Sequence, residues 1–367
     1  MGRTVAVLGG GHGALTLAAD LTLQGHRVRL FELESFRDRI RTVFDNQTIE
    51  AVGDVLSGTA HIELVTSDID AALVDAEVVL VAVPAFGHRT YAELLAPRVK
   101  DGQLVTLLPG TLGTLEFART WHDLSVDPSV VLAETDTFPY ATRAERTGVV
   151  HAYGRTTVKV GVFPASQSET ALKLLGELLD ITAASNVLEV GFSSLNPVLH
   201  PAGTILNIGR IERSRGNFFI YEEGMTPSVT RVIDALDAER LAIAAAFGLT
   251  LPTVAESLHS SGYGPSGTTW ETLNGSASLT PISGPFDVNT RYLAEDLPYG
   301  LATWSSIGRQ VGVAAPLMEA LLAVGSALSP QLASAPPRTA SSLGLDGLDV
   351  SQVIDYVTAG GWAPHVP

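Results

Sequence analysis

A glycine-rich turn near the N-terminus constrains this chain more than any other feature. The apolar run 5–8 leads directly into Gly9-Gly10-Gly11-His12-Gly13-Ala14, and a helical segment with apolar residues follows. In the spacing G-x-G-x-x-A, Gly9 permits a tight turn, Gly11 leaves room for a pyrophosphate, and Ala14 lets the helix pack close to the strand. The pattern therefore predicts a dinucleotide-binding turn, the alternative being a structural turn in another kind of α/β protein.

The start of that helix and the end of the next strand complete the predicted cofactor site. His12 and Gly13 stand at the helix start, where free N–H groups and the positive dipole end bind phosphate. The predicted strand 28–31 ends at Glu32, about 20 residues after the glycines, where an acid holds a ribose 2′-hydroxyl. These residues are therefore expected to contact a nicotinamide dinucleotide.

The choice between the two nicotinamide cofactors depends on the charges after that strand. Arg37 and Arg39 follow Glu32, and either guanidinium would suit the 2′-phosphate of NADP. A solvated helix face is the other interpretation of these arginines. Because the carboxylate of Glu32 repels a 2′-phosphate, we expect NAD(H) to be preferred, with NADP(H) remaining possible.

Apolar strand segments alternate with helical ones up to about residue 190, which predicts an open, mostly parallel sheet. The continuous apolar run 78–85 is typical of a central parallel strand, so Val83, Pro84 and Ala85 are expected at its carboxyl end beside the cofactor. The turn 109–114 belongs to the same edge, either approaching the nicotinamide or serving as an ordinary loop. The predicted strands are 5–8, 28–31, 62–66, 78–85, 104–108, 130–135, 158–163 and 186–190.

Strand signals vanish after Ser194, and long periodic segments predict helices instead. The fold class is therefore α/β: a doubly wound Rossmann sheet over residues 1–190, followed by an all-helical domain over 191–367. Residues 237–240 are interpreted as a helix start or an exposed turn, 329–340 as a surface loop and 360–364 as a tail. The predicted helices of the second domain are 198–211, 228–247, 254–258, 300–311 and 316–328.

Charge and composition exclude several function classes. The 367 residues carry a formal net charge of −16 without a run of Lys or Arg, which argues against nucleic acid and anionic membranes as partners. No apolar run reaches membrane-spanning length. The absence of cysteine excludes disulfides and zinc–thiolate sites and fits the cytoplasm. The pair Glu256 and His259 has no further ligand cluster near it, so we expect no metal.

A dinucleotide enzyme needs a group that gives or takes a proton, and His200 is the outstanding candidate among nine histidines. It follows the last predicted strand, although a structural histidine at a helix start is the other interpretation. A carboxylate beside it, for which Asp296 is the candidate, would orient the imidazole. Arg143 and Arg291 are candidates for binding a substrate carboxylate, and surface ion pairs are the alternative for both.

Taken together, several segments resemble the opine dehydrogenase family of the octopine/nopaline type. They run in family order from residue 5 to about residue 300 and so cover most of the chain. The matching residues are Val83-Pro84-Ala85, Pro109-Gly110 with Leu115-Glu116-Phe117, Glu134-Thr135, Val198-Leu199-His200-Pro201 with Leu206-Asn207, Tyr221 with Glu223-Gly224-Met225-Thr226-Pro227-Ser228-Val229, Asp237-Ala238-Glu239-Arg240, Gly284-Pro285, and Asn289-Thr290-Arg291-Tyr292 with Glu295-Asp296.

The resemblance implies an N-terminal Rossmann domain, a helical second domain and a reductive condensation. Such enzymes join the amine of an amino acid to a 2-oxo acid, often pyruvate, with NADH or NADPH as reductant. The family's catalytic His–Asp pair corresponds to His200 and Asp296. The expected substrate contacts are Arg143, Thr135, Tyr221, Asn207 and Arg291.

Other functions on the same two-domain plan remain open at the level of sequence. They are reduction of imines of simple amines, reduction of a 2-oxo acid to a 2-hydroxy acid, and cofactor sensing without catalysis. Reductases with a catalytic lysine in the helical domain are disfavoured because residues 191–367 contain no Lys. We expect a homodimer, since helical second domains often bury apolar surface against a second copy.

Overall fold

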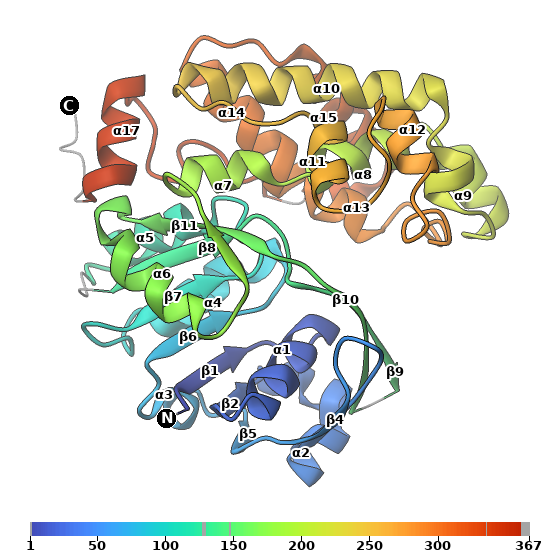
Figure 1. Ribbon diagram of the computed structural model, residues 1–367. Helices are drawn as coiled ribbons and strands as arrows, with labels where there is room; N and C mark the ends of the chain where they lie inside the picture. The colour runs from blue at the N-terminus through green and yellow to red at the C-terminus, as the bar shows by residue number, and fades with distance from the viewer. Residues whose placement is uncertain (1, 127–129, 147, 335, 361–367) are drawn as a thin grey trace. The chain divides into compact units, whose positions relative to one another are not determined.

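The computed structural model describes residues 2–126, 130–146, 148–334 and 336–360 (Figure 1). The chain divides into two compact units. The first spans Met1–Gly191 and takes up the chain again from Asp355, and the second spans Phe192–Ile354. The returning segment lies in the helix α17 (Val350–Ala359), which the sequence patterns did not predict.

The first unit is built on an eight-stranded sheet with the order β12-β11-β8-β7-β6-β1-β2-β5. Neighbours from β8 to β5 are parallel, β11 is antiparallel to β8, and β12 is parallel to β11. This arrangement confirms the predicted Rossmann-like α/β fold. The strand bounds are β1 Thr4–Leu8, β2 Arg27–Phe31, β5 Leu64–Thr66, β6 Val78–Val81, β7 Leu104–Leu107, β8 Val131–Thr135, β11 Val158–Phe163 and β12 Ile181–Ala183.

The strand order reverses between β1 and β6, and this point positions the cofactor turn. β1 pairs with β2 on one side and with β6 on the other, and both β1 and β6 are fully buried. Helix α1 (His12–Leu23) begins directly beyond the glycine turn. Ligands of such sheets bind at the carboxyl ends of the strands next to this reversal. The remaining helices of this unit are α2 Arg41–Asn46, α3 Ile69–Leu73, α4 His88–Leu95, α5 Gly113–Asp123, α6 Ser168–Gly176 and α7 Val187–Ser193.

A second, four-stranded sheet with the order β4-β3-β10-β9 is absent from the sequence predictions. Its strands β3 (Thr48–Val52), β4 (Gly58–His61), β9 (Tyr140–Arg146) and β10 (Val149–Arg155) pack against α1 (Figure 1). Several of them mix polar and charged residues with short apolar ones, so periodicity does not mark them as strands.

A buried carboxylate on α1, the helix that follows the glycine turn, links this helix to the second sheet. Asp20 accepts hydrogen bonds from Nε2 of Gln24, at 2.8 Å, and from the hydroxyl of Tyr140. It also forms an ion pair with Arg155, at 2.6 Å. One turn earlier on the helix, the Thr16 and Thr142 hydroxyl oxygens lie 2.7 Å apart. Because Asp20 is 3% exposed, these partners supply the hydrogen bonds that a buried carboxylate requires.

The predicted strand 186–190 is wrong, because this segment belongs to helix α7. The side chain of Asn186 accepts hydrogen bonds from the N–H groups of Leu188 and Glu189, at 2.9 and 3.2 Å. Side chains of this type at a helix start satisfy N–H groups that have no partner within the helix. A short apolar run does not distinguish a strand from a buried helix, and the sheet edge is instead taken by β12.

The second unit is helical, as predicted, and its described residues contain one isolated bridge, between Phe219 and Ser283, and no longer strand. The predicted helix 198–211 is two helices that separate near Asn207. Two π-helical turns, η4 (Ile220–Gly224) and η5 (Leu297–Leu301), interrupt the regular pattern. The helices are α8 Asn196–Ile205, α9 Ile208–Ser214, α10 Pro227–Ala246, α11 Val254–Ser260, α12 Thr269–Asn274, α13 Arg291–Ala294, α14 Ala302–Gln310, α15 Pro316–Leu328 and α16 Pro330–Ser334.

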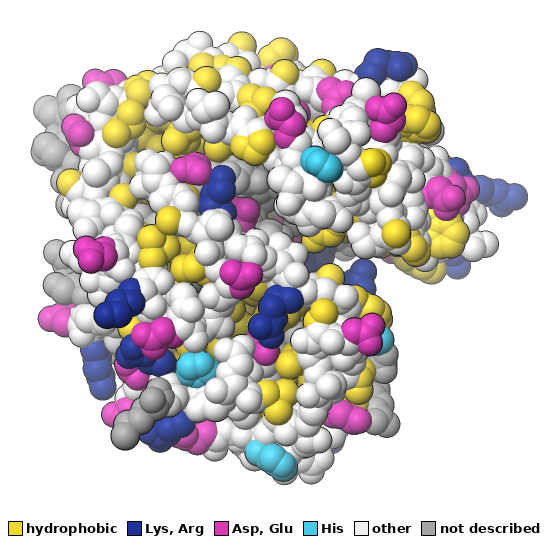
Figure 2. All heavy atoms as spheres, in the orientation of Figure 1, with side chains coloured by type: hydrophobic (Ala, Val, Ile, Leu, Met, Phe, Trp, Pro, Cys, Tyr) yellow, Lys and Arg dark blue, Asp and Glu magenta, His cyan; other side chains and the backbone are white. Residues whose placement is uncertain are grey.

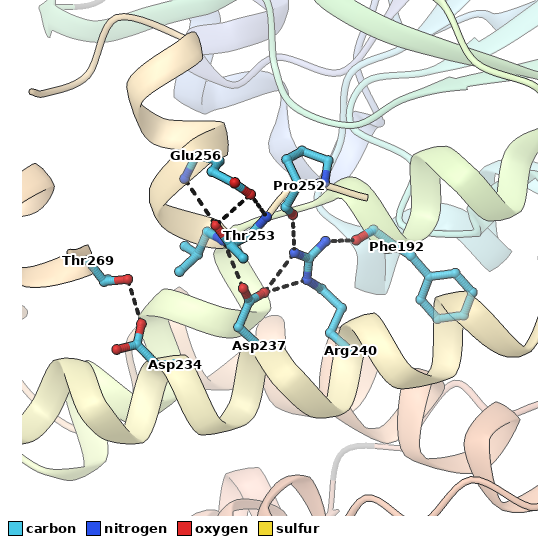
Figure 3. A network of polar contacts seen from close by, with 9 residues as sticks. Phe192, Asp234, Asp237, Arg240, Pro252, Thr253, Glu256 and Thr269 are labelled. Carbon is cyan, nitrogen blue, oxygen red and sulfur yellow. Dashed lines mark hydrogen bonds and ion pairs between the residues drawn. The ribbon is translucent and has the colours of Figure 1, made fainter. Parts of the chain in front are cut away.

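The interpretation of residues 237–240 as a helix start or exposed turn is wrong. They lie inside the 20-residue helix α10, where Arg240 is 1% exposed. Figure 3 shows its guanidinium bound to Asp237 and to the carbonyl oxygens of Phe192 and Pro252, at 2.7, 2.6 and 2.8 Å. The other oxygen of Asp237 accepts from the N–H of Val254 at 2.8 Å. The pattern was misinterpreted because charged residues are rarely buried unless they are paired.

The neighbouring Glu239 explains the start of another helix. Its two carboxylate oxygens accept hydrogen bonds from the N–H groups of Leu317 and Met318, at 2.7 and 2.9 Å. Because Pro316 begins α15, these N–H groups lie in the first turn and have no partner inside the helix. The segment 237–240 therefore organises three parts of the helical unit.

Two further expectations concern the end of the chain. Residues 329–340 are not a plain surface loop: they include α16, and Arg338 and Ala340 are 1% and 4% exposed. The N–H of Arg338 donates to the carbonyl oxygen of Pro298 at 2.9 Å, which fixes this segment on η5. The expected tail 360–364 lies outside the described residues from position 361 onward.

Candidate active site

The helical unit brings His200 and Asp296 together. Nδ1 of the imidazole lies 2.8 Å from Oδ2 of the carboxylate, although 96 positions separate the two residues in the chain. Each side chain is 12% exposed, so the pair is largely shielded from water and retains some access to it. The structure thus shows the contact between these two side chains that sequence patterns did not establish.

The backbone around this pair explains why the two side chains meet. His200 lies on α8, and Asp296 directly precedes η5. A Cβ on Gly300 of η5 would lie 2.5 Å from the Cβ of Pro197 on α8, so a glycine is required for this close approach. Because η5 packs this closely on α8, the carboxylate before it reaches the imidazole.

The environment defines the protonation of the pair. Burial raises the pKa of the Asp296 carboxyl above its ordinary value, while the hydrogen bond from His200 opposes that rise. A carboxylate at Nδ1 accepts a hydrogen bond, so Nδ1 carries the proton and Nε2 is the nitrogen left for a reacting group. Within the described part of the chain, Nε2 of His200 has no hydrogen-bond partner. The arrangement is therefore suited to general acid–base chemistry at Nε2.

Two tyrosines adjoin the pair. The ring of Tyr292 stacks on the imidazole of His200, with centroids 3.9 Å apart and planes inclined by 15°. Tyr221, on η4, is 5% exposed, and burial raises the pKa of its hydroxyl, with smaller contributions from Tyr292 and Asp296. Tyr221 was a predicted substrate contact, whereas Tyr292 was part of a matching segment without a role. Its four-residue spacing from Asp296 is the signal that could have directed both side chains toward the same partner.

The other two predicted contacts of the helical unit have partners within it. Arg291 binds Oε2 of Glu295 through Nε and Nη2, at 2.8 and 2.6 Å, and its side chain is 68% exposed. Asn207 donates from Nδ2 to the carbonyl oxygens of Gly203 and Gly224, at 2.8 and 3.0 Å. Asn207 therefore holds the end of α8 against η4.

The remaining predicted substrate contacts lie in the first unit. Thr135 ends β8 and is buried, and its hydroxyl donates to the carbonyl oxygen of Thr137 at 2.7 Å. Arg143 lies on β9 and is exposed, beside Ala144, whose N–H lies 3.4 Å from Nδ1 of His12. Arg143 is thus placed near the first turn of the cofactor helix.

The glycine turn has the backbone geometry that a dinucleotide requires. Apart from the two neighbours of Gly11 in the chain, no atom of the described residues lies within 4 Å of where its Cβ would be, so the backbone there is open to a phosphate. Gly9 has φ of +118°, and a Cβ on it would lie 2.7 Å from the carbonyl oxygen of Ala82. The turn thus packs directly against the chain that leads to Val83, Pro84 and Ala85.

The acid after β2 also lies at this turn. A Cβ on Gly10 would be 2.5 Å from Oε2 of Glu32, so the carboxylate closes over the glycines. Its Oε1 accepts from the N–H of Leu33 at 2.7 Å, and the hydroxyl of Tyr91 lies at 3.5 Å. Burial raises the pKa of the Glu32 carboxyl, with these hydrogen bonds opposing it. An acid beside the glycine turn is the arrangement that binds the adenosine ribose.

Gly13 and Ala14, at the start of α1, are small residues in closely packed positions. A Cβ on Gly13 would lie 2.7 Å from the ring of Phe138, so this glycine makes room for the segment that leads into β9. Ala14 is fully buried, in agreement with its predicted packing role. Gly13 thus has a structural reason to be small, whichever group binds at the turn.

Sequence patterns did not anticipate the part played by Glu134 in the turn 109–114. Glu134 is fully buried, and its carboxylate accepts from the N–H groups of Leu112 and Thr114 and from the Thr114 hydroxyl, at 2.8, 2.9 and 2.9 Å. A Cβ on Gly110 would lie 2.2 Å from the Cβ of Glu134. Gly110 is therefore needed to bring this turn onto the carboxylate. This contact explains why Gly110 and Glu134, from two of the matching segments, occur together.

Other classes of site find little support in the described residues. They contain no group of three or more His, Asp or Glu side chains placed to hold a metal ion. None of the helices in the described part of the chain combines the length and apolar character that a membrane crossing needs. On the face drawn in Figure 2, acidic and basic side chains are interspersed and form no continuous basic patch among the described residues.

Two family models match successive parts of this chain. Residues 183–329 match the family model "NAD/NADP octopine/nopaline dehydrogenase, alpha-helical domain", and residues 4–114 match "NAD-dependent glycerol-3-phosphate dehydrogenase N-terminus". The chain is 38% identical over 355 residues to an opine dehydrogenase of Arthrobacter sp. (strain 1C), covering 96% of this chain and 98% of that protein.

Solved structures share the fold. An octopine dehydrogenase with NADH and L-arginine superposes with a TM-score of 0.76 at 20% identity, covering 99% of both chains. A yersinopine dehydrogenase with NADP⁺ gives 0.73 at 15% identity, covering 98% of both. Near-complete coverage at 38% identity, together with the match of the helical-domain model, decides the assignment. The chain therefore belongs to the opine dehydrogenase family, NAD(P)-dependent oxidoreductases that reductively condense a 2-oxo acid with an amino acid.

Proposed function

We propose that this enzyme reduces the imine formed between pyruvate, or a close analogue, and an amino acid, with His200 and Asp296 as the proton-transferring pair. The observation that carries the proposal is the 2.8 Å contact between Nδ1 and Oδ2 in a shielded position, with Nε2 left for a reacting group. The matching segments most resemble the bacterial N-(1-D-carboxylethyl)-L-norvaline dehydrogenase, which makes an apolar amino acid the first substrate to test.

The chemistry of the pair follows from its protonation. The amine adds to the carbonyl carbon of the oxo acid, and the adduct loses water when Nε2–H of His200 protonates the departing hydroxyl. The resulting iminium carbon accepts a hydride, which bound NAD(P)H supplies, and the product is a secondary amine that carries two carboxylates. Asp296 orients the imidazole and stabilises its protonated form throughout.

Cations are needed because the substrates contribute two carboxylates to a chain with a net charge of −16. We assign carboxylate binding to Arg291 and Arg143, since a guanidinium holds a carboxylate through two hydrogen bonds. Arg291 would share or exchange its contact with Glu295 when substrate binds. Thr135, Tyr221 and Asn207 are assigned as hydrogen-bonding contacts, an assignment supported by their place in the matching segments.

We further propose NAD(H) as the preferred cofactor, with NADP(H) as an alternative. Support comes from the Glu32 carboxylate, which lies over the glycine turn where the 2′-phosphate of NADP would add negative charge. Relatives provide for both possibilities, since one solved structure contains NADH and another NADP⁺. Binding titrations with NADH and NADPH, followed by the fluorescence of the nicotinamide, measure this preference directly.

A homodimer is also proposed, on the general tendency of helical second domains to bury apolar surface against another copy. Light scattering coupled to size-exclusion chromatography gives the mass in solution. A mass near 77 kDa, about twice the 38.6 kDa of one chain, supports the dimer. A mass near that of one chain at micromolar concentration refutes it.

The decisive experiment follows NADH oxidation with pyruvate and a panel of amino acids and simple amines, beside a His200→Ala variant. Oxidation that requires both the oxo acid and an amino acid, and that falls sharply in the variant, supports the proposal. Oxidation with pyruvate and simple amines but no amino acid would make the enzyme an imine reductase of simple amines. Oxidation with pyruvate as the sole acceptor would make it a 2-oxo acid reductase. Full turnover by the variant would assign the proton transfer to another residue.

A further inference from the structure

We propose that Tyr292 is a positioning residue that holds the ring plane of His200 and favours its protonated form. The ring of Tyr292 lies face to face with the imidazole, 3.9 Å between centroids and 15° from parallel. This contact is independent of the hydrogen bond to Asp296, which meets the imidazole at its edge. The inference rests on the proposed role of His200 as the proton-transferring group.

The local sequence explains how one short segment supplies both contacts. Thr290 caps α13, with its hydroxyl accepting the N–H of Tyr292 at 3.3 Å. Asp296 follows Tyr292 by four residues, and this spacing places two side chains on one face of a helical turn. α13 packs against α8, which carries His200. α13 therefore presents the Tyr292 ring to the face of the imidazole, and Asp296, two residues beyond the end of α13, presents its carboxylate to the edge.

The two contacts constrain different motions. A hydrogen bond at Nδ1 fixes one corner of the ring but leaves it able to tilt about the line from Nδ1 to the acceptor. A second ring stacked on the face opposes that tilt, so the direction of Nε2 is determined. Because proton transfer needs the donor within hydrogen-bond distance and well aligned, loss of the stack lowers the rate of the chemical step more than substrate affinity.

The stack also has an electrostatic effect. The face of an aromatic ring carries negative charge density, which attracts a cation held over it. The imidazolium form of His200 is therefore stabilised relative to neutral imidazole by Tyr292 as well as by Asp296.

Several ionisable groups surround His200. Asp296 touches it directly and Tyr292 covers its face. Other ionisable groups influence Asp296 and Tyr221 rather than His200 directly. Arg291 and Glu295 affect the pKa of Asp296, and Tyr263 affects that of Tyr221. Removal of the Tyr292 ring leaves these groups in the chain, so a change in the titration of His200 can be attributed to the stack.

The test combines two substitutions with two measurements. Tyr292→Phe keeps the ring and loses the hydroxyl, whereas Tyr292→Leu removes the ring. The pKa of His200 is measured by NMR titration of its ring nitrogens in the cofactor-free protein, with His200→Gln to assign the signal. The pH profiles of kcat and KM are measured in parallel. Thermal unfolding of each variant verifies that it is folded.

We expect Tyr292→Phe to leave the pKa of His200 within about 0.2 units of the parent value, because the ring is retained. Tyr292→Leu should lower that pKa by about half a unit to one unit and reduce kcat roughly tenfold, with KM changed less than about threefold. An unchanged pKa and pH profile in a folded Tyr292→Leu variant overturns the proposal. Equal effects of Phe and Leu also overturn it, because they would point to the hydroxyl.

A second stacked pair in the first unit provides a matched control. Tyr153 stacks on His151, with centroids 4.1 Å apart and planes 20° from parallel, and Tyr153 is 58% exposed. Tyr153→Leu removes this stack and should leave the NMR titration of His200, and kcat, unchanged. A comparable loss of kcat in this control would contradict the specific role of Tyr292.

The NMR titration separates failure of this inference from failure of the proposed function. If His200→Ala retains full turnover while Tyr292→Leu still lowers the pKa of His200, the stack positions a histidine that is not the proton donor. If His200→Ala abolishes turnover and Tyr292→Leu leaves the pKa of His200 unchanged, the proposed function holds and the positioning role falls.

Discussion

Two of the acid–base pairs in the helical unit have opposite designs. Arg240 and Asp237 are 1% and 4% exposed, and the guanidinium and carboxylate bind carbonyl and N–H groups of neighbouring segments as well as each other. His200 and Asp296 are each 12% exposed, and Nε2 has no partner within the described residues. The first pair organises the fold and satisfies its polar groups, whereas the pair that we propose for proton transfer keeps one nitrogen for the substrate.

The choice of base strengthens this contrast. Arg remains charged at any pH at which the protein is folded, so Asp237 always faces a cation. Histidine changes its charge near neutral pH, so the second pair can pass a proton to a substrate and recover it. The two pairs should therefore respond to substitution in different measurements, one in stability and the other in rate.

The largest effect is expected from His200→Ala. Loss of the proposed proton-transferring group should lower kcat/KM by about 10²–10⁴-fold, while the melting temperature changes by no more than a few degrees. Steady-state kinetics and thermal unfolding give both numbers from one preparation. A variant with normal turnover would remove the functional half of the contrast.

Arg240→Met should act almost entirely on stability. It leaves the carboxylate of Asp237 buried without its cation and frees the carbonyl oxygens of Phe192 and Pro252, at a cost of about 3–5 kcal/mol in free energy of unfolding. Denaturant unfolding measures this loss. At a temperature where the variant is folded, kcat should remain within about twofold of the parent value. A large loss of kcat in folded protein would show that this pair also serves catalysis.

Glu32→Gln tests the charge at the cofactor turn and should have a smaller effect. Removing the carboxylate relieves repulsion of a 2′-phosphate, so the Kd for NADPH should fall roughly tenfold relative to that for NADH. Fluorescence titration of both cofactors measures the ratio. Arg291→Lys, remote from this turn in sequence and in the other unit, serves as the control and should leave the ratio unchanged. An unaltered ratio in Glu32→Gln would refute the proposed basis of NAD preference.

The smallest effect is expected in the pH dependence of the stability of Asp296→Asn, and its sign distinguishes this pair from Asp237 and Arg240. Burial raises the pKa of the Asp296 carboxyl in the folded protein, so folding favours the protonated form. The associated stabilisation is complete below the ordinary pKa of the carboxyl and is lost as pH rises through the raised value. Relative to the parent, the free energy of unfolding of Asp296→Asn should therefore increase as pH rises above the ordinary pKa of the carboxyl.

Denaturant unfolding at several pH values checks this trend, and kcat of Asp296→Asn should fall even where stability improves. A gain in relative stability toward acid pH would instead mean that the ion pair with His200 outweighs the burial of the carboxylate.

Much of the fold could be predicted because its signals are local. The glycine turn, Glu32 and the apolar runs of β6 and β7 follow from neighbouring residues and the periods of helix and strand. The strand expected at 186–190 failed because an apolar run of this length suits both structures, and Asn186 decides for a helix. The second sheet was missed because its strands are stabilised by α1 and by Asp20, which lie far from them in the chain.

The candidate site was predictable as a set of residues but not as an arrangement. His200 and Asp296 were named from residue type and resemblance, and their contact depends on the close packing of Gly300 on Pro197. The roles of Asp237, Glu134 and Tyr292 were missed or misassigned. Each depends on a partner from a distant segment, and the sequence around a buried charge resembles the sequence around an exposed one.

The sequence by itself determined the α/β class, the dinucleotide turn and the residue types available for proton transfer, because these follow from backbone geometry and side-chain chemistry at short range. The tertiary structure decided which side chains meet. It brought His200 into contact with Asp296 and Tyr292. It also buried Arg240 against Asp237, Phe192 and Pro252, and Glu134 beneath the turn 109–114. The physical reason is that hydrogen bonds, ring stacking and burial act over a few ångströms in space, whatever the distance along the chain.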